Sequence, residues 1–259
     1  MSRARLKKID NYNWGKIKLI ASDLDGTLTK AERFDSKLFE TLIKLSAAKV
    51  DVLITTGRSA GWVQAIASYL PVVGAMAENG GLLYWQDSAV PQLTSEIDLD
   101  LHRRELSRVF ELLQSKFPLL KESQDNKFRL TDWTFDVEGL SLNELNQIEY
   151  VCKSEGYGFT YSTIQCHIKP SYQDKAFGLN KVIPQYFPNL TSEQILTIGD
   201  SPNDESMFNS EQFPLSVGVA NVEKYGDRLK YLPAYMTNQF EGAGFNELAE
   251  LIMRDRAFN

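Results

Sequence analysis

The chain has 259 residues, a length that fits one large α/β domain or a core of ordinary size with a smaller inserted domain. It is 43% hydrophobic and 24% charged, as expected for a globular protein, and its formal net charge of -6 gives no electrostatic reason to expect a nucleic-acid partner. No run approaches the roughly 20 apolar residues that a membrane helix needs, so we expect no membrane partner.

The N-terminal part of the chain alternates short apolar runs with helical patterns. Residues 16–22, 50–55 and 72–77 are predicted as buried strands. A helix through residues 38–45 follows the first strand, and a helix through residues 62–69 follows the second. This succession of strand and helix predicts a doubly wound parallel sheet.

The pattern changes after Leu82. We predict a strand that turns back at 82–85, helices at 99–117 and 142–155, a half-exposed strand at 127–137 and another strand at 159–169. Two helices against one antiparallel sheet form an α+β layer. We place this inserted domain at residues 85–168, and the core domain in residues 1–84 and 169–259.

The parallel pattern then resumes. We predict a helix that opens at Lys175, a strand at 194–198, a helix with Pro202 in its first turn, short strands at 217–220 and 234–237, and a last helix through 245–252. The predicted fold class is therefore α/β: a doubly wound, Rossmann-like parallel core with an inserted α+β domain.

Two aspartates follow the first predicted strand. Asp23 and Asp25 are two residues apart, so strand geometry would put their side chains on one face. Ligands of open parallel sheets bind beyond the carboxyl ends of the strands, where this pair lies. One carboxylate could attack phosphorus while the other handles the proton of the leaving group. A plain Asp-Gly turn is the alternative, and the pair alone does not decide between them.

A second acidic pair, Asp200 and Asp204, follows the strand at 194–198 in the segment GDSPND. Carboxylates at neighbouring strand ends would repel one another without a cation, and Mg²⁺ prefers oxygen ligands. Helix capping by Ser201 and Asp204 is the alternative. Capping would account for one of the aspartates in the two motifs, but not for the other three.

Other polar residues lie just past the predicted strand ends. The hydroxyl of Thr56 could hold a phosphate oxygen, although a helix cap is the simpler use of an isolated threonine. Lys175 could reduce the repulsion between a nucleophilic carboxylate and phosphate, but a lone lysine is usually a solvated surface charge. We assign substrate binding to four further residues: Thr27, Gly57, Arg58 and Asn79.

The order of these motifs resembles that of the haloacid dehalogenase superfamily. DLDGTLT, TTGRS, a lysine that opens a helix, and GDSPND match its four motifs, across residues 18–83 and 170–245. One departure is local, because many relatives have Lys-Gly at the third motif and this chain has Lys175-Ala176.

The resemblance implies a role for each motif residue. It makes Asp23 the nucleophile and Asp25 the general acid and base, whose backbone carbonyl also binds Mg²⁺. It gives Thr56 and Lys175 catalytic roles at the phosphate. The acidic residues of the fourth motif, here Asp200 and Asp204, then belong to the metal site, and Mg²⁺ is the expected cofactor.

The long gap between the second and third motifs resembles the subgroup with an α/β cap at that place. The segments AENGG at 77–81 and TNQFEGAGFNEL near the C-terminus are similar to segments of that subgroup. Its members commonly hydrolyse sugar phosphates, so the expected partner is a small phosphomonoester. A phosphomutase and a non-catalytic sugar-phosphate sensor stay open as alternatives. Asp25 and GDSPND argue against a dehalogenase, which needs neither.

The remaining signals are weaker. Cys152 and Cys166 form no CxxC pair, which fits a reducing cytoplasm, and the basic N-terminus lacks the apolar core of a secretory signal. His102 and His167 have no companion at metal-ligand spacing, and we interpret both as structural or surface residues. For Trp133, as for His167, packing is expected, with contact to the substrate as the alternative. The oligomeric state is not predicted.

Overall fold

The structure is a computed structural model that describes residues 6–86, 88 and 90–257. A nine-stranded sheet with the order β1-β12-β11-β10-β2-β3-β4-β5-β6 lies at its centre. The strands are β1 (Lys7–Lys8), β2 (Leu19–Ser22), β3 (Asp51–Thr55), β4 (Gly74–Ala77), β5 (Leu82–Trp85), β6 (Gln92–Leu93), β10 (Ile195–Gly199), β11 (Ser216–Gly218) and β12 (Tyr235–Met236). The pairs from β1 to β4 are parallel, and β5 turns back against β4 as expected.

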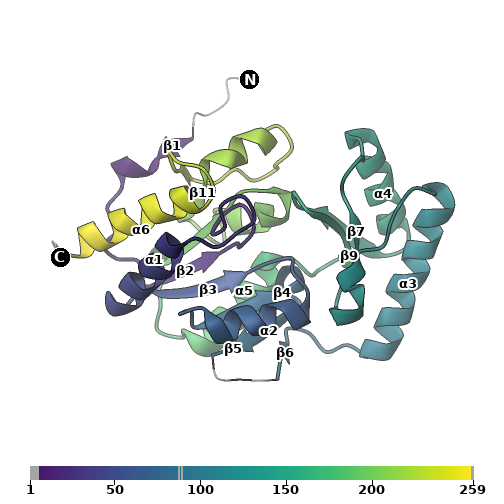
Figure 1. Cartoon of the computed structure of the whole chain (residues 1–259), viewed down its shortest axis with the longest axis horizontal. Coiled ribbons are helices and arrows are strands. Elements are labelled where there is room, and N and C mark those ends of the chain that lie inside the picture. Colours follow the sequence, from purple (N-terminus) through teal and green to yellow (C-terminus); the bar gives the residue numbers. More distant parts are fainter. Residues whose placement is uncertain (1–5, 87, 89, 258–259) are drawn as a thin grey trace.

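Helices cover both faces of this sheet (Figure 1). The helices α1 (Ser36–Ala47), α2 (Ala60–Tyr69) and α6 (Glu241–Ala257) pack on one face, and α5 (Lys175–Tyr186) packs on the other. Because strand side chains alternate, Ile20 of β2 joins the first cluster while Leu19 and Ala21 face α5. Both faces are buried, which explains why the strands are continuous apolar runs.

A second layered unit lies to the right of the sheet in Figure 1. Its three antiparallel strands have the order β7-β9-β8, and they are β7 (Trp133–Asp136), β8 (Tyr157–Tyr161) and β9 (Gln165–Pro170). The helices α3 (Leu99–Lys116) and α4 (Leu142–Ser154) pack on it around Phe110, Phe135 and Ile148, which belong to a hydrophobic cluster separate from that of the main sheet. The predicted α/β class with an inserted α+β layer is confirmed.

The described residues also contain six short 3-10 helices. They are Ile9–Asn11, Glu78–Gly80, Gln124–Phe128, Ser192–Gln194, Pro202–Phe208 and Ala220–Tyr225. The segment that begins at Pro202 was expected to be an ordinary helix, and it is a 3-10 helix instead. Within it, the side chain of Asp204 accepts a hydrogen bond from the backbone N–H of Asp200, just before the helix.

Two strand predictions in the inserted layer are wrong in part. The strand predicted at 127–137 is shortened to Trp133–Asp136, because residues 124–128 form a 3-10 helix and Arg129 and Asp132 form a buried ion pair before the strand begins. The strand predicted at 159–169 is a hairpin, in which residues 162–164 turn the chain from β8 into β9. The alternating pattern alone did not show where the chain reverses.

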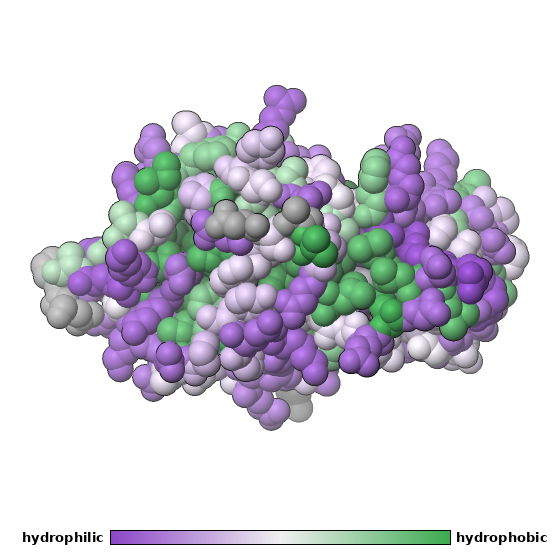
Figure 2. Space-filling model, turned by 90° about the horizontal axis from the view of Figure 1, so that it is seen from below, coloured by the Kyte–Doolittle hydropathy of each residue, from purple (hydrophilic) through white to green (hydrophobic). Residues whose placement is uncertain are grey.

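Figure 2 shows hydrophilic residues over most of the face seen from below, with apolar residues gathered toward the side of the inserted layer. Within the part of the chain that the structure describes, no helix is both long and apolar enough to cross a membrane.

Candidate active site

Three neighbouring parallel strands bring the sequence motifs together. In the order β10-β2-β3, the strands are followed by Asp200, Asp23 and Thr56 respectively. Asp23 continues the alternation of Leu19 and Ala21, so its side chain points to the face that α5 covers. These motifs therefore meet at the carboxyl edge of the sheet, as the chain order predicted.

Lys175, the first residue of α5, lies between two carboxylates. Its Nζ donates to Oδ1 of Asp23 at 2.5 Å and to Oδ1 of Asp204 at 2.6 Å. The lysine side chain is fully buried, which by itself lowers its pKa, but Asp204 and Asp23 raise the pKa above the usual value. Lys175 is therefore a buried cation shared by two motifs, and not a solvated surface charge.

The acidic cluster has more negative charge than Lys175 can balance. The pKa of Asp23 is raised to about 7, because burial and repulsion by Asp204 raise it by more than Lys175 lowers it. Burial and the charge of Asp23 also raise the pKa of Asp200. Three carboxylates against one ammonium are the surroundings in which a further cation is stabilising.

Unpaired carboxylate oxygens show where a cation would fit. Asp23, Asp200 and Asp204 each offer an oxygen, and these oxygens lie within 4.8 Å of one another. Oδ2 of Asp23 and Oδ1 of Asp200 are buried and have no hydrogen-bond partner in the described residues. Buried acceptors without donors are costly, and these two match the hard oxygen ligands that Mg²⁺ prefers.

The other three carboxylate oxygens of the fourth motif already have hydrogen-bond partners. Oδ2 of Asp204 accepts from the backbone N–H groups of Asp200 at 2.8 Å and Ser201 at 3.0 Å, and its Oδ1 faces Lys175. Oδ2 of Asp200 accepts from Nδ2 of Asn221 at 2.6 Å. Asn221, which our sequence reasoning did not single out, thus orients Asp200, while Asp204 both caps its turn and holds the lysine.

Asp25 and Arg58 form an ion pair at the rim of the site. Nε and Nη2 of Arg58 donate to the two carboxylate oxygens of Asp25 at 2.8 and 2.7 Å. The guanidinium also lies 5.1 Å from the ring centre of Trp62. The sequence suggested a substrate contact for Arg58, and in this structure its charge is directed at Asp25.

The remaining predicted residues have mixed surroundings. Oγ1 of Thr56 accepts from the N–H of Arg58 at 3.1 Å, a local turn bond of the kind expected for a cap. Oγ1 of Thr27 and Nδ2 of Asn79 are buried and have no hydrogen-bond partner among the residues that the structure describes, and Oδ1 of Asn79 accepts from Asn203 at 3.0 Å. Thr27 and Asn79 do not line the pocket over Asp23.

The inserted layer contributes part of the lining of the pocket over Asp23. The pocket is lined by Asp23, Asp25, Thr56, Gly57, Arg58, Ser201 and Asn203 from the core and by Ser162, Ile164, Gln165 and His167 from the β8–β9 hairpin. The four hairpin residues were not predicted, except that substrate contact was an alternative for His167. No spacing signal in the sequence marks them, because their position depends on where the hairpin docks.

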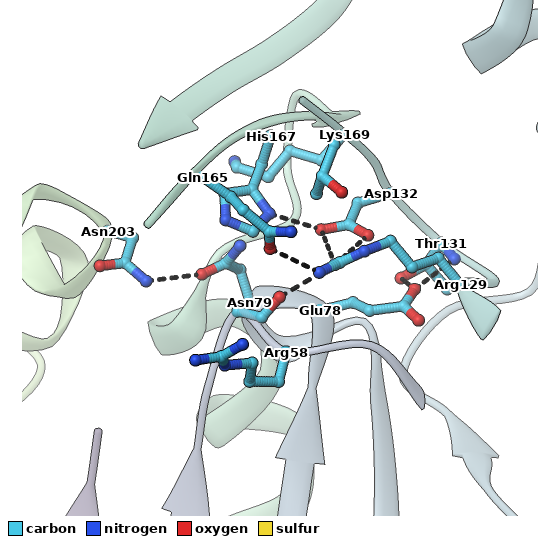
Figure 3. A network of polar contacts seen from close by, with 12 residues as sticks. Arg58, Glu78, Asn79, Arg129, Thr131, Asp132, Gln165, His167, Lys169 and Asn203 are labelled. Atoms are coloured by element: carbon cyan, nitrogen blue, oxygen red, sulfur yellow. Dashed lines mark hydrogen bonds and ion pairs between the residues drawn. The ribbon is translucent and has the colours of Figure 1, made fainter. Parts of the chain in front are cut away.

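A buried polar network joins the inserted layer to the core (Figure 3). The carboxylate of Glu78 accepts from the N–H groups of Ala60 at 2.9 Å, Leu130 at 3.0 Å and Thr131 at 2.5 Å, and from the Thr131 hydroxyl at 2.8 Å. Arg129 donates to the carbonyl of Gly57 at 2.9 Å. Glu78 from the core and Arg129 from the inserted segment thus each bond to the other unit.

We expect Glu78→Gln to lower the free energy of unfolding by about 2 kcal/mol at pH 8. One carboxylate oxygen would become an amide NH₂ group, which cannot accept the hydrogen bonds that the backbone N–H groups now donate to it. Burial and the charge of Asp132 raise the pKa of Glu78 to about 7, so the comparison is made above that pH. Urea denaturation measures the change. Glu96→Gln, at an exposed position, is the matched control, and an equal effect of both changes would contradict the role of Glu78.

Comparisons with known proteins identify the family of this chain. The family model of sucrose-6F-phosphate phosphohydrolase matches residues 16–240, and the chain belongs to this family. It is 29% identical over 238 residues to a phosphoglycolate phosphatase of Methanothrix thermoacetophila, which covers 90% of this chain and 96% of the relative. It is 28% identical over 194 residues to a phosphoglycolate phosphatase of Thermoplasma acidophilum, with 74% and 81% covered.

Solved structures show the same fold. A Thermoplasma acidophilum protein superposes with a TM-score of 0.73 at 24% identity and covers 92% of this chain and 98% of its own. The C-terminal domain of trehalose-6-phosphate phosphatase from C. albicans gives a TM-score of 0.70 at 17% identity, with 96% and 99% covered. The resemblance to the haloacid dehalogenase superfamily is confirmed, and the chain is a phosphatase of that type.

Proposed function

We propose that this member of the sucrose-6F-phosphate phosphohydrolase family hydrolyses a small, sugar-like phosphomonoester through an aspartyl-phosphate on Asp23, with Mg²⁺ as cofactor. One observation supports this most directly. The Asp23 carboxylate lies at the pocket, with Oδ1 on Lys175 and Oδ2 buried without a partner. Oδ2 is then free for the cation, and Oδ1, which Lys175 holds in place, is the oxygen that attacks phosphorus.

Mg²⁺ would be held by Asp23, by Asp200 and by the backbone carbonyl of Asp25. When bound, it would offset the excess negative charge of the cluster and stabilise the negative charge of the phosphate. Asn221 keeps Asp200 in position, and Asp204 stays with Lys175. In this proposal Asp204 therefore supports the metal site without being a direct ligand.

In the first step a carboxylate oxygen of Asp23 bonds to phosphorus while the bond from phosphorus to the leaving oxygen breaks. Asp25 gives the leaving alkoxide its proton. Arg58 occupies both oxygens of Asp25 in this structure, so Asp25 has to rotate away from Arg58 before that transfer. The freed Arg58, together with Lys175 and Thr56, is then available to the phosphate oxygens.

In the second step water attacks the phosphorus of the aspartyl-phosphate. Asp25 takes a proton from that water, and the bond between phosphorus and Asp23 breaks to restore the carboxylate. Phosphate leaves, and no other reactant is needed.

We further propose that residues 85–168 act as a cap that closes over the substrate. The four hairpin residues that line the pocket support this role, because they face Asp23 from the inserted layer. A closed cap excludes bulk water from the aspartyl-phosphate and selects the leaving group. The buried cysteines, both free, support a reducing compartment, and we place the enzyme in the cytoplasm.

The test is phosphate release from a panel of phosphomonoesters, assayed with Mg²⁺ and with EDTA. The panel contains sucrose 6-phosphate, trehalose 6-phosphate, hexose monophosphates, phosphoglycolate and p-nitrophenyl phosphate. We expect release that depends on Mg²⁺ and returns when Mg²⁺ is added after EDTA. A folded protein that binds Mg²⁺ but releases phosphate from none of them would favour a phosphomutase or a sensor.

A further inference from the structure

His167 is a buried side chain that faces the pocket. Its neighbours on β9, Cys166 and Ile168, pack into the hydrophobic cluster of the inserted layer, so the alternation of the strand turns His167 to the opposite face. The side chain is only 1% exposed, and it lines the pocket together with Asp23 and Thr56. A buried imidazole at that place needs partners for its two nitrogens.

One nitrogen has a fixed partner. Nδ1 lies 2.8 Å from Oδ2 of Asp132, and Asp132 is itself held by Nη1 of Arg129 at 2.8 Å (Figure 3). Although burial alone would raise the pKa of Asp132, Arg129 and His167 lower it below the usual value, so Asp132 is ionised and can only accept. The hydrogen of a neutral His167 is therefore on Nδ1.

The other nitrogen, Nε2, lies against the turn formed by Thr56–Arg58. Burial lowers the pKa of His167, which keeps the ring neutral, so Nε2 has a free lone pair. A β-carbon added to Gly57 would lie 2.9 Å from Cε1 and 3.1 Å from Nε2, so this end of the ring rests on the Thr56–Arg58 turn. In the described residues, Nε2 forms no hydrogen bond.

The cations near the pocket are already paired. Arg58 is bonded to Asp25 and is assigned to the phosphate once it is freed, and Lys175 is bonded to two carboxylates of the core. Arg129 is bonded to Asp125 and Asp132, and Lys169, next to His167, donates to the carbonyl of Gln173. The rest of the hairpin lining is Ser162, Ile164 and Gln165, which are uncharged. A carboxylate on the leaving group would thus lose its hydration without gaining a free positive charge, whereas a hydroxyl would find an acceptor.

We propose that His167 is a specificity-determining residue, which accepts a hydrogen bond from a hydroxyl of the leaving group and so selects polyol phosphates over phosphomonoesters that bear a carboxylate. Asp132 is its positioning residue, because the bond to Nδ1 fixes both the ring and the tautomer. This inference rests on the proposed phosphatase function and names the substrate class.

The test compares three small substrates under saturating Mg²⁺. Glycerol 3-phosphate offers a hydroxyl near the ester, phosphoglycolate offers a carboxylate at a similar distance, and p-nitrophenyl phosphate offers neither. For the unmodified enzyme we expect kcat/KM for glycerol 3-phosphate to exceed that for phosphoglycolate by roughly tenfold or more, the size of one well-placed hydrogen bond. Release from p-nitrophenyl phosphate reports on the proposed function separately.

Two substitutions test the roles of the two ring nitrogens of His167 one at a time. In His167→Asn the amide can still donate to Asp132 from the position of Nδ1 but has no acceptor at Nε2, so kcat/KM for glycerol 3-phosphate should fall about tenfold more than kcat/KM for p-nitrophenyl phosphate. His167→Gln can place its amide oxygen near Nε2 and should recover part of the loss. Cys166→Ala, on the other face of β9, is the control for a change in packing.

Asp132→Asn tests the positioning role. The asparagine amide can donate to Nδ1 and so impose the opposite tautomer, in which Nε2 donates. The preference for glycerol 3-phosphate over phosphoglycolate should then shrink. Three outcomes would overturn the inference: an enzyme that prefers phosphoglycolate, an equal loss on all three substrates in His167→Asn, or an unchanged preference in that variant. Absence of release from every substrate would contradict the phosphatase proposal instead.

Discussion

Replacing Asp23 by Asn should abolish phosphatase turnover, with kcat reduced by about 10⁴-fold or more, while the fold is retained. The amide has nearly the shape of the carboxylate, but its nitrogen and carbonyl oxygen are poor nucleophiles toward phosphorus. Lys175 keeps its ion pair with Asp204, so the buried cation is not left alone. The measurement is phosphate release under saturating Mg²⁺, with circular dichroism to check the fold.

A matched control makes the same chemical change at a distance. Asp35 caps α1 by accepting from the N–H of Leu38, and Asn is an equally good cap, so Asp35→Asn should leave turnover and stability nearly unchanged. Mass spectrometry of acid-quenched enzyme should detect a phosphorylated peptide containing residue 23 in the unmodified enzyme and none in Asp23→Asn. Substantial turnover in Asp23→Asn would refute the assignment of the nucleophile.

The second large effect is expected from Lys175→Met, which removes the buried cation between two carboxylates. The change should lower the free energy of unfolding by about 3–5 kcal/mol, because Asp23 and Asp204 would then face each other without a counter-charge. Turnover should fall as well, since Lys175 both holds Asp23 and balances charge at the phosphate. Chemical denaturation measures the first effect, and phosphate release the second.

The reference for this change is on the same helix. Lys181 is exposed on α5, so Lys181→Met should alter the free energy of unfolding by roughly 0.5 kcal/mol or less. If repulsion is the cause, adding Asp204→Asn to Lys175→Met should recover part of the lost stability without restoring turnover. Equal destabilisation by the two lysine substitutions would show that Lys175 is not the counter-charge of the cluster.

The amino-acid sequence by itself determined the core of this protein and the composition of its acidic cluster. In a parallel sheet the carboxyl ends of the strands share one edge, so a residue that follows a strand is placed by local periodicity and chain order. Asp23, Thr56 and Asp200 each follow a run of buried residues. Lys175 was placed by the helix that it opens, and the structure brings it between Asp23 and Asp204.

Only the tertiary structure decided the partners of the other groups. Asp25 and Arg58 are 33 positions apart in the chain, and the sequence did not show that their charges pair. The hairpin at 157–170 appeared as one strand, because both of its arms have strand-forming residues and Ser162–Ile164 have no strong turn signal. His167 was interpreted as a structural or packing residue because it has no companion at metal-ligand spacing in the sequence. Its proposed role depends on which face of β9 lies against the core and on the contacts that Arg129 and Glu78 make between the two units. A periodic pattern of residues predicts local structure, but it does not predict such contacts between distant segments.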